Sequence, residues 1–136
     1  MELSRYCIPY TPFAGELAKS KVLLASTSGV HLKSDPPFNM EGDITYRVIP
    51  GDVDTADLMV THTHYDHSDA DQDVNCVFPL DRLRELVQEG FIGSLTDHHY
   101  TMGFSMAFRQ IREETLPQLV REIERNRPNV VLLTGG

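Results

Sequence analysis

The sequence predicts an α/β fold of the Rossmann-like or flavodoxin-like kind, with a mostly parallel sheet covered by helices in a single domain. Short apolar runs alternate along the chain with segments of helical periodicity. The runs at residues 21–27 and 130–134 are apolar without alternation, which is typical of strands buried on both faces of a parallel sheet. A length of 136 residues suits one hydrophobic core. We expect an N-terminal arm over residues 1–20 and an α/β domain over residues 21–136 that is incomplete at its C-terminal end.

The first half of the chain contains three segments that predict strands. Each is a run of apolar or β-branched residues between turn-forming or polar residues, at residues 21–27, 44–49 and 57–62. The run at 44–49 alternates and ends at Pro50-Gly51, which indicates a half-buried or edge strand. Residues 28–43 and the polar stretch after residue 62 are expected to be loops, and a helical turn is expected near residues 15–19.

Two helices and two further strands are predicted in the second half. Leucines at helical spacing after a proline favour a helix over residues 79–87. Residues 105–126 carry apolar side chains on one helical face; Pro117 is expected to kink or divide this helix, and Thr115 to cap its second part. The predicted strands are short apolar runs at residues 91–96 and 130–134.

Composition and charge restrict the classes of partner and compartment. The chain has 12 Lys and Arg against 20 Asp and Glu, and a formal net charge of −8 argues against nucleic-acid binding, which needs a basic face. No apolar run approaches the roughly 18 residues of a membrane span, and the N-terminus lacks the features of a signal peptide. We therefore expect a cytoplasmic protein that binds neither nucleic acid nor membranes. Cys7 and Cys76 lie far apart in the sequence, so we expect free thiols.

Three segments that follow predicted strands carry polar and conformationally special residues. In the first, Ser28 and Gly29 come directly after a buried strand, and small residues there let an anionic group approach backbone N–H groups. The alternative is a turn in which Gly29 only provides a positive φ angle, since no phosphate-binding glycine motif is present.

The second segment, residues 61–67, fits the pattern His-x-His-x-Asp-His, which resembles the zinc-binding motif of the metallo-β-lactamase family. His62 and His64 alternate and would point to one side of an extended segment, while Asp66 and His67 could bind a second ion. The Gly-Gly that follows in that family is absent here, and the only later histidines are two adjacent ones. The alternative is a polar substrate loop with solvated histidines.

The third segment, residues 97–103, carries His98 and His99 between a predicted strand and the long helix, and is expected to be a loop. Because the carboxyl ends of parallel strands open on one edge of a sheet, we expect the three segments to meet there. With His31 in the first segment, their histidines favour a pocket that handles protons or binds a ligand.

Several longer strings are distinctive. Residues 42–50 read Gly-Asp-Ile-Thr-Tyr-Arg-Val-Ile-Pro, and residues 64–66 read His-Tyr-Asp. Residues 75–86 read Asn-x-x-Phe-Pro-Leu-Asp-Arg-Leu-Arg-Glu-Leu, and Glu-Gly-Phe-Ile-Gly follows at residues 89–93. In these strings the chain resembles the selenoprotein B family of glycine, sarcosine, betaine and D-proline reductases, and the resemblance extends from about residue 22 to residue 136.

The resemblance implies a reactive residue next to the last predicted strand. Members of the family carry selenocysteine just after the counterpart of residues 130–134, and Gly136 stands immediately before that position. Selenocysteine is encoded by UGA, ordinarily a stop codon. We therefore hypothesise that the native protein is longer, that its redox nucleophile follows Gly136, and that the chain itself holds no cofactor and is inactive alone. A UAA or UAG codon after Gly136 would contradict this hypothesis.

The chemistry implied by the resemblance is reductive cleavage of a C–N bond α to a carboxylate. A selenol suits this role because it is ionised at neutral pH, whereas a Cys thiol with a pKa of ~8.5 mostly is not. The expected partners are a small-molecule substrate or a carrier subunit, and a thiol reductant such as a thioredoxin-like protein. Association of the chain into a homo-oligomer is also compatible with an exposed C-terminal strand.

Site residues follow from the needs of this chemistry. The candidates for binding the substrate carboxylate are Arg47 and the backbone of Ser28-Gly29. A histidine would protonate the leaving amine, and the candidates are His31, His64 and His98. Asp43 and Asp66 would position these histidines or an ammonium group. Cys76 is expected to be a buried small residue rather than a resolving thiol.

Two other functions stay open. The first is a zinc hydrolase with zinc as cofactor, whose ligands would be His62, His64, Asp66 and His67. The second is a nucleophile-free accessory or binding domain. The reductase interpretation requires residues 22–25 and 130–133 to be parallel neighbours or near neighbours, with Gly136 and Ser28 on one edge beside His64 or His98. The zinc interpretation requires histidine nitrogens that converge to about 2 Å from one ion.

Overall fold

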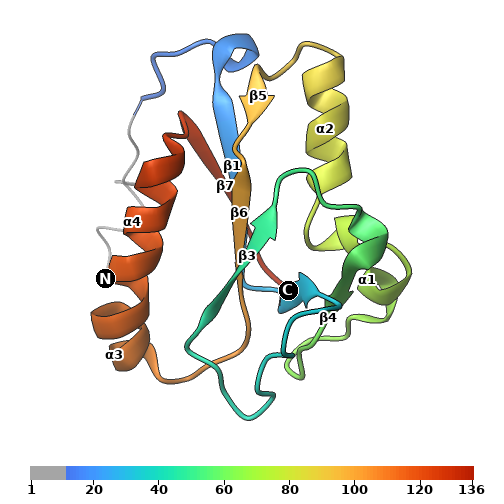
Figure 1. The fold of residues 1–136 in the computed structure, drawn as a ribbon, viewed down its shortest axis with the longest axis vertical. Helices are drawn as coiled ribbons and strands as arrows, with labels where there is room; N and C mark the ends of the chain where they lie inside the picture. Colours follow the sequence, from blue (N-terminus) through green and yellow to red (C-terminus); the bar gives the residue numbers. More distant parts are fainter. Residues whose placement is uncertain (1–11) are drawn as a thin grey trace, which may run out of the picture.

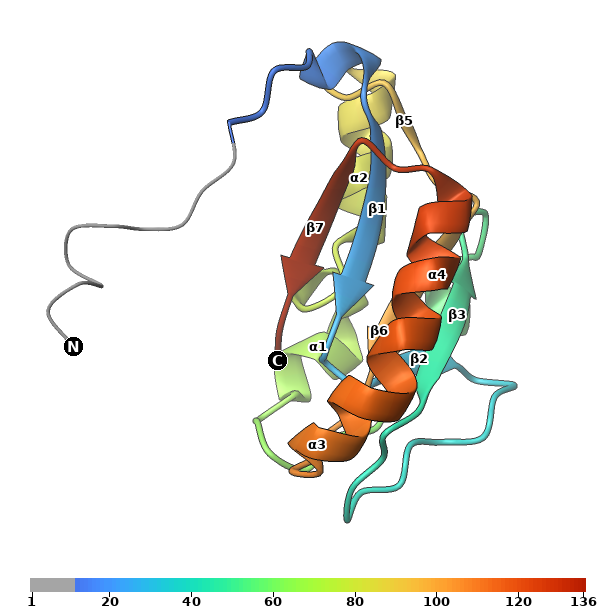
Figure 2. The same ribbon diagram turned by 90° about the vertical axis from the view of Figure 1, so that its left-hand side faces the viewer.

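The computed structural model describes residues 12–136, which form an α/β domain with a mostly parallel sheet (Figures 1 and 2). The larger sheet consists of β1 (Lys21–Ser26), β3 (Tyr46–Pro50), β5 (Ser94–Leu95), β6 (His98–Met102) and β7 (Val130–Thr134). A smaller sheet pairs β2 (Val30–Leu32) with β4 (Leu58–Val60). The helices are α1 (Ser68–Gln72), α2 (Leu80–Gln88), α3 (Phe108–Gln110) and α4 (Leu116–Asn126). The predicted fold class is confirmed.

β1 forms the centre of the larger sheet. Along one edge it pairs in parallel with β7 from Val22 to Ser26, and along the other it pairs in parallel with β5 and then with β6. β3 runs antiparallel to β6 and forms the far edge. The predicted parallel adjacency of residues 22–25 and 130–133 is therefore confirmed, as is the edge strand predicted near residues 44–49.

Helices cover both faces of this sheet, with α3 and α4 on one side and α1 and α2 on the other (Figure 1). The core on the α2 side contains Leu24, Ile49, Phe78 and Leu80. The core on the α4 side contains Leu23, Tyr100 and Leu119. Because successive β1 side chains enter opposite cores, the strand is apolar without alternation.

Gly29 ties the smaller sheet to the carboxyl end of the larger one. Its N–H donates to the Met102 carbonyl at 2.9 Å, and its carbonyl accepts from Thr61 N at 2.9 Å. Its φ of +74° lies in the left-handed region, and a Cβ atom there would collide with the Thr61 carbonyl oxygen. The prediction that residues 28–43 form only a loop is wrong, because Val30–Leu32 pairs with β4.

The prediction of a loop at residues 97–103 is also wrong, because His98–Met102 forms β6 between β1 and β3. Two adjacent histidines concealed this strand in the sequence. His99 is nevertheless fully buried. Its Nδ1 accepts a hydrogen bond from Leu24 N at 3.0 Å, which satisfies one polar atom of the buried ring. The strand predicted at residues 91–96 shortens to the two residues of β5, and the polar stretch expected to be a loop contains α1.

The long helix predicted at residues 105–126 runs through α3 and α4 with one widened turn between them, the π-helix Ile111–Thr115. Pro117 is the second residue of α4, which begins where this turn ends. Proline cannot donate a backbone hydrogen bond, and a widened turn leaves room for its ring. Thr115 does not cap α4 with its side chain, because its hydroxyl donates to the Ile44 carbonyl instead.

The arm begins with residues outside the described part of the chain, which include Cys7. Among the residues that are described, Leu17–Lys19 forms a 3₁₀ turn, in agreement with the helical turn predicted near residues 15–19. None of the helices in residues 12–136 is long and apolar enough to cross a membrane.

Candidate functional site

A pocket of about 480 Å³ lies where the carboxyl ends of β1, β6 and β7 meet the smaller sheet. Thr27 follows β1, Gly103 follows β6, and Gly136 follows β7, and all three line the pocket. His62 and His64, which follow β4, complete its polar side. Its apolar side is formed by Met102, Phe104, Met106, Phe108, Ile111 and Leu116. Gly136 and His64 therefore lie on one edge, as the reductase interpretation requires.

His62 is held as a hydrogen-bond donor toward the pocket. Its Nδ1 accepts a hydrogen bond from His64 N at 3.1 Å, so its proton resides on Nε2. Burial, with smaller effects from the nearby His64 and His67, lowers the pKa of His62 below its ordinary value of 6.5. At neutral pH this ring is an uncharged donor.

His64 is oriented by stacking. Its ring lies parallel to Phe104, with centroids 3.2 Å apart and an angle of 10° between the planes. Its Nδ1 lies 2.9 Å from the hydroxyl of Thr63, which leaves Nε2 available to a ligand. The side chain is exposed to solvent, so it can exchange protons with water as well as with a bound molecule.

Tyr65 supports the turn that follows β7. Its hydroxyl donates to the Ser28 carbonyl at 2.7 Å. A Cβ atom at Gly136 would collide with its ring, so the backbone at this position packs directly on the aromatic face. Burial and the charge of Asp71 raise the pKa of Tyr65 to about 12, so the phenol stays protonated. The turn therefore rests on a neutral, fixed side chain.

The backbone of Ser28 and Gly29 is already engaged. Ser28 is fully buried, and its N–H donates to the Ser26 hydroxyl at 3.2 Å. The Gly29 N–H donates to Met102, as described above. Both N–H groups therefore already have acceptors within the chain, and the conformational role of Gly29 is the one that the geometry supports.

His31 is also engaged on both sides of its ring. Its Nδ1 lies 2.7 Å from the Leu32 carbonyl, and its Nε2 lies 2.8 Å from the Thr61 hydroxyl. The residue is buried in β2. This arrangement holds the smaller sheet together and does not present a nitrogen to the pocket.

Arg47 and Asp43 stabilise the loop that precedes β3 and do not line the pocket. The guanidinium lies 4.2 Å from the centre of the Phe38 ring, donates to the Pro36 carbonyl, and approaches Asp43 Oδ2 at 3.7 Å. Burial opposes ionisation of Asp43, but hydrogen bonds from Thr45 and Asn39, together with Arg47, lower its pKa. Both residues have partners within their own loop.

His98 lies away from the pocket. It pairs with Pro50 at the start of β6, whereas the pocket is at the other end of that strand, next to Met102. Among the three histidines considered for protonating a leaving group, only His64 lines the pocket.

The four residues of the zinc alternative are not gathered around one point. Asp66 is exposed and accepts a hydrogen bond from Ser68 N at 3.1 Å, which lowers its pKa. His67 Nδ1 lies 2.9 Å from Asp71. Across residues 12–136, no group of three or more His, Cys, Asp or Glu side chains is arranged to hold a metal ion. The geometry favours the reductase interpretation over the hydrolase one.

Two residues of the site were missed by the sequence analysis. Phe104 orients His64, and Tyr65 supports Gly136. The signal for Tyr65 was its place inside the His64-Tyr65-Asp66 string, but the signal for Phe104 depends on how β6 ends, and that strand was not predicted. Cys76, expected to be buried, is exposed.

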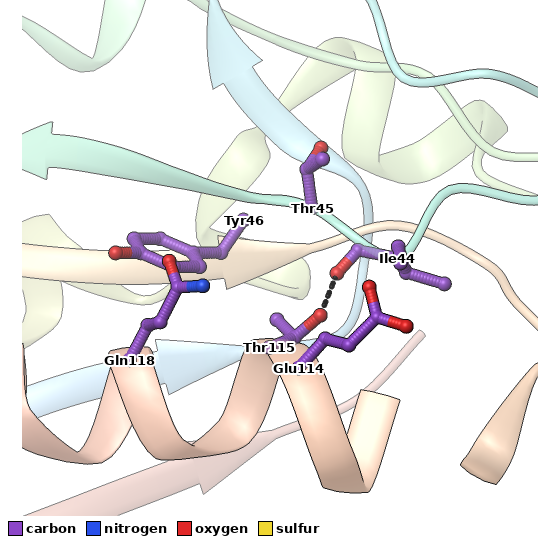
Figure 3. A pocket seen from close by; sticks show the side chains of 6 residues that line it. All are labelled: Ile44, Thr45, Tyr46, Glu114, Thr115 and Gln118. Carbon is purple, nitrogen blue, oxygen red and sulfur yellow. Dashed lines mark hydrogen bonds between the residues drawn. The ribbon is translucent and has the colours of Figure 1, made fainter. Parts of the chain in front are cut away.

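A second pocket lies at the start of β3, against the π-turn (Figure 3). It has a volume of about 300 Å³ and is lined by Tyr46, Glu114 and Gln118. Two further lining residues, Thr115 and Ile44, are joined by a hydrogen bond from the Thr115 hydroxyl to the Ile44 carbonyl (Figure 3). It contains no histidine and lies beside the antiparallel edge strand β3, not between the parallel strands β1, β6 and β7, so the larger pocket is the better candidate for chemistry.

The structure is an α/β domain with a pocket at the carboxyl edge of a mostly parallel sheet, the edge where open α/β sheets commonly bind small molecules. The chain matches the family model described as glycine/sarcosine/betaine reductase selenoprotein B over residues 7–135. It therefore belongs to this family, as the sequence strings indicated.

Curated relatives give the same assignment. The chain is 41% identical over 128 residues to D-proline reductase subunit gamma of Acetoanaerobium sticklandii, an alignment that covers 93% of this chain and 53% of that protein. It is 29% identical over 134 residues to glycine reductase complex component B subunit gamma of Symbiobacterium thermophilum, covering 94% of this chain and 31% of that protein. It is 30% identical over 97 residues to sarcosine reductase complex component B subunit beta of Peptoclostridium acidaminophilum, covering 67% of this chain and 22% of that protein. No solved structure matches the chain. The chain thus spans about half of the first relative and less of the others.

Proposed function

We propose that this chain forms the substrate-binding part of a reductase subunit that cleaves a C–N bond α to a carboxylate. The observation that supports this function is the position of His62 and His64 in one pocket with the turn at Gly136, at the carboxyl edge of the sheet. In open α/β sheets, this edge is where ligands and reactive groups lie.

D-proline is the substrate that the comparisons favour. Identity to the D-proline reductase subunit is 41%, against 29% to a glycine reductase subunit and 30% to a sarcosine reductase subunit. The apolar side of the pocket, which includes Phe108 and Leu116, suits the methylene groups of a proline ring. Glycine has only its α-carbon methylene and no ring to bury.

The nucleophile in this proposal is a selenol that belongs to the part of the full-length subunit outside this chain and reaches the pocket beside Gly136. Such a selenol would displace the amine from the α-carbon and would be regenerated by a thiol reductant such as a thioredoxin-like protein. The site is compatible with this supply, because Gly136 lines the pocket and its backbone packs closely against the Tyr65 ring. If the substrate is attached to another subunit and is not a free small molecule, that carrier subunit would bring it to the pocket.

The residues of the chain would bind the substrate and move a proton. His64 Nε2 would give a proton to the leaving amine, since the departing nitrogen carries away the electron pair of the C–N bond. The uncharged His62 would donate a hydrogen bond from Nε2 to the substrate carboxylate. Phe104 would hold His64 in place and exclude water from one side.

The test compares two histidine variants in the reductase complex from the native organism. We expect His64→Gln to lower kcat for D-proline at least ~100-fold, the usual contribution of a general acid. The matched control is His98→Gln, on the exposed start of β6, which should keep the wild-type rate. Equal rates for the two variants would overturn the role of His64, and the absence of any C–N cleavage by the wild-type complex would overturn the function.

A further inference from the structure

β7 is an edge strand with apolar residues exposed on both faces. In residues 12–136 it pairs only with β1, so its outer row of backbone N–H and C=O groups has no strand partner. Val131 is 39% exposed, Leu132 36% and Leu133 74%. Natural sheets protect such edges with charges, prolines or a covering element. β7 contains no charged residue and no proline.

The apolar surface continues from β7 onto α4. In Figure 2, α4 lies over β6 and β3 and leaves β7 uncovered on that side. Leu116 and Leu133 line a small cavity of about 210 Å³ between α4 and the sheet. Val120 lies one turn from Leu116 on the same helix face and is 49% exposed. Leu116, Val120, Val131 and Leu133 together form what we call the β7 strip.

We propose that the β7 strip binds the remaining half of the full-length reductase subunit, which adds a strand parallel to β7 and a helix across Val131 and Leu133. The occupant follows from length: the D-proline reductase subunit is about twice as long as the region that this chain matches. That additional polypeptide needs an apolar surface to pack on. This inference depends on family membership and not on the role of His64 or the identity of the substrate.

The sheet itself selects the orientation of the new strand. β1 pairs in parallel with all its neighbours, and helices lie on both sides of the larger sheet (Figure 1). An added strand in this part of the sheet is parallel and comes with its own helix, because parallel strands are connected by helical crossovers. That helix would lie beside α4 and fill the cavity that Leu133 now lines.

A second copy of the chain fits the β7 strip less well. Two copies related by a two-fold axis would pair β7 with β7 in antiparallel fashion, against the direction of the surrounding sheet. They would also bring together two chains that each carry a net charge of −8. The other open edge offers no comparable surface, since Val48 on β3 is the large apolar residue exposed there.

The experiment co-expresses the tagged chain with the half of the Acetoanaerobium sticklandii D-proline reductase subunit gamma that lies outside the matched region, so that the two can fold together. We expect a 1:1 complex by light scattering, with backbone amides of β7 protected from hydrogen exchange at least tenfold more than in the chain alone. Leu133→Lys and Val120→Lys, on two different elements, should each abolish the complex. The matched control Val48→Lys, on the other edge strand, should leave it intact.

Each other result overturns the proposal. Recovery of the chain without the second polypeptide would do so, as would a complex that survives both lysine substitutions. A homodimer of the chain that the same substitutions dissolve would assign the β7 strip to self-association instead. Circular dichroism of each variant verifies that the domain is folded, which is expected because Leu133 and Val120 are exposed to solvent.

Discussion

His99 is a buried histidine whose ring is held in its neutral form. Its Nδ1 accepts the Leu24 N–H, and its Nε2 has no hydrogen-bond partner in the described residues. Burial, with smaller effects from Arg84 and His98, lowers the pKa of His99 from 6.5 to about 4. A charged ring at this position has no partner, so protonation opposes folding.

The consequence is a stability that depends on pH in a defined window. Between pH 4 and 6.5 the unfolded chain binds a proton that the folded chain does not, so this contribution is complete above pH 6.5 and is lost as the pH falls toward 4. Its full size is roughly 3 kcal/mol from the shift in pKa. Urea unfolding at pH 7.5 and at pH 5 should show most of this difference in the wild type.

The His99→Asn variant should have a much flatter pH dependence, since its amide oxygen can accept the Leu24 N–H without titrating. His62→Asn is the control, because the pKa of His62 is also lowered but its side chain is only partly buried. If the pH dependence of the unfolding free energy persists in His99→Asn and vanishes in His62→Asn, it comes from His62 and the prediction for His99 is contradicted.

At the scale of elements, the start of α2 is fixed to the turn after β3 by a polar network. Asp81 accepts hydrogen bonds from the Thr55 hydroxyl at 2.6 Å and from Asn75 Nδ2 at 3.0 Å. Arg84 pairs with Asp81 at 2.8 Å and donates to the Gly51 carbonyl at 2.9 Å. We expect Asp81→Ala to lower the free energy of unfolding by about 2 kcal/mol, because it leaves several donors without an acceptor.

The control for this prediction lies on the same helix. Glu85 forms an exposed ion pair with Arg82 at 2.8 Å, and Glu85→Ala should cost about 0.5 kcal/mol or less. Denaturation in urea measures both variants. Similar losses for Asp81→Ala and Glu85→Ala would mean that the network contributes no more than a surface pair.

The same elements show what the sequence could predict. β1 and α2 were predicted because burial on one or both faces leaves a direct pattern of apolar residues. The apolar run at residues 130–134 also predicted a strand correctly, but the burial expected on both of its faces is wrong, because β7 is an edge strand with Val131, Leu132 and Leu133 exposed. β6 was missed because a polar side chain, His99, fills one of its core positions. The hydrogen-bond partner of this buried ring is the Leu24 N–H, 75 residues earlier in the chain, so the sequence around His99 gives no sign of it. The partners of Arg84 could not be read from the sequence for a similar reason, since its guanidinium donates to carbonyl groups in the turn after β3.

The candidate site follows the same rule. The apolar run before His64 predicts a strand of the parallel sheet, which would place His64 at the carboxyl edge. The position is right but the reason is not, because that run is β4 of the smaller antiparallel sheet, which Gly29 joins to the carboxyl end of β6. The distance between His64 and His98 depends on strand register, and the partners of Arg47 depend on how its own loop packs. The spacing of apolar residues in the sequence carries no information about either.

At the scale of the whole molecule, the pocket exists because two sheets are joined at a fixed distance. The larger sheet supplies Thr27 and Gly136, and the smaller sheet leads into His62 and His64. The joint is Gly29, which bonds to residues on both sides. Displacement of one sheet relative to the other would therefore open the pocket without unfolding either.

Gly29→Ala tests this joint. The left-handed φ of +74° costs an alanine about 1 kcal/mol, and its Cβ would also collide with the Thr61 backbone, which cannot rotate away. Gly90 is the matched control, with the same φ of +74° but open space around the Cβ position. We expect Gly90→Ala to cost about 1 kcal/mol in urea unfolding, and Gly29→Ala about 3 kcal/mol because strain and overpacking add.

In NMR spectra, Gly29→Ala should also shift the resonances of His62 and His64, whereas Gly90→Ala should leave them in place. Equal costs, with unchanged histidine resonances in both variants, would show that the two sheets do not depend on this contact.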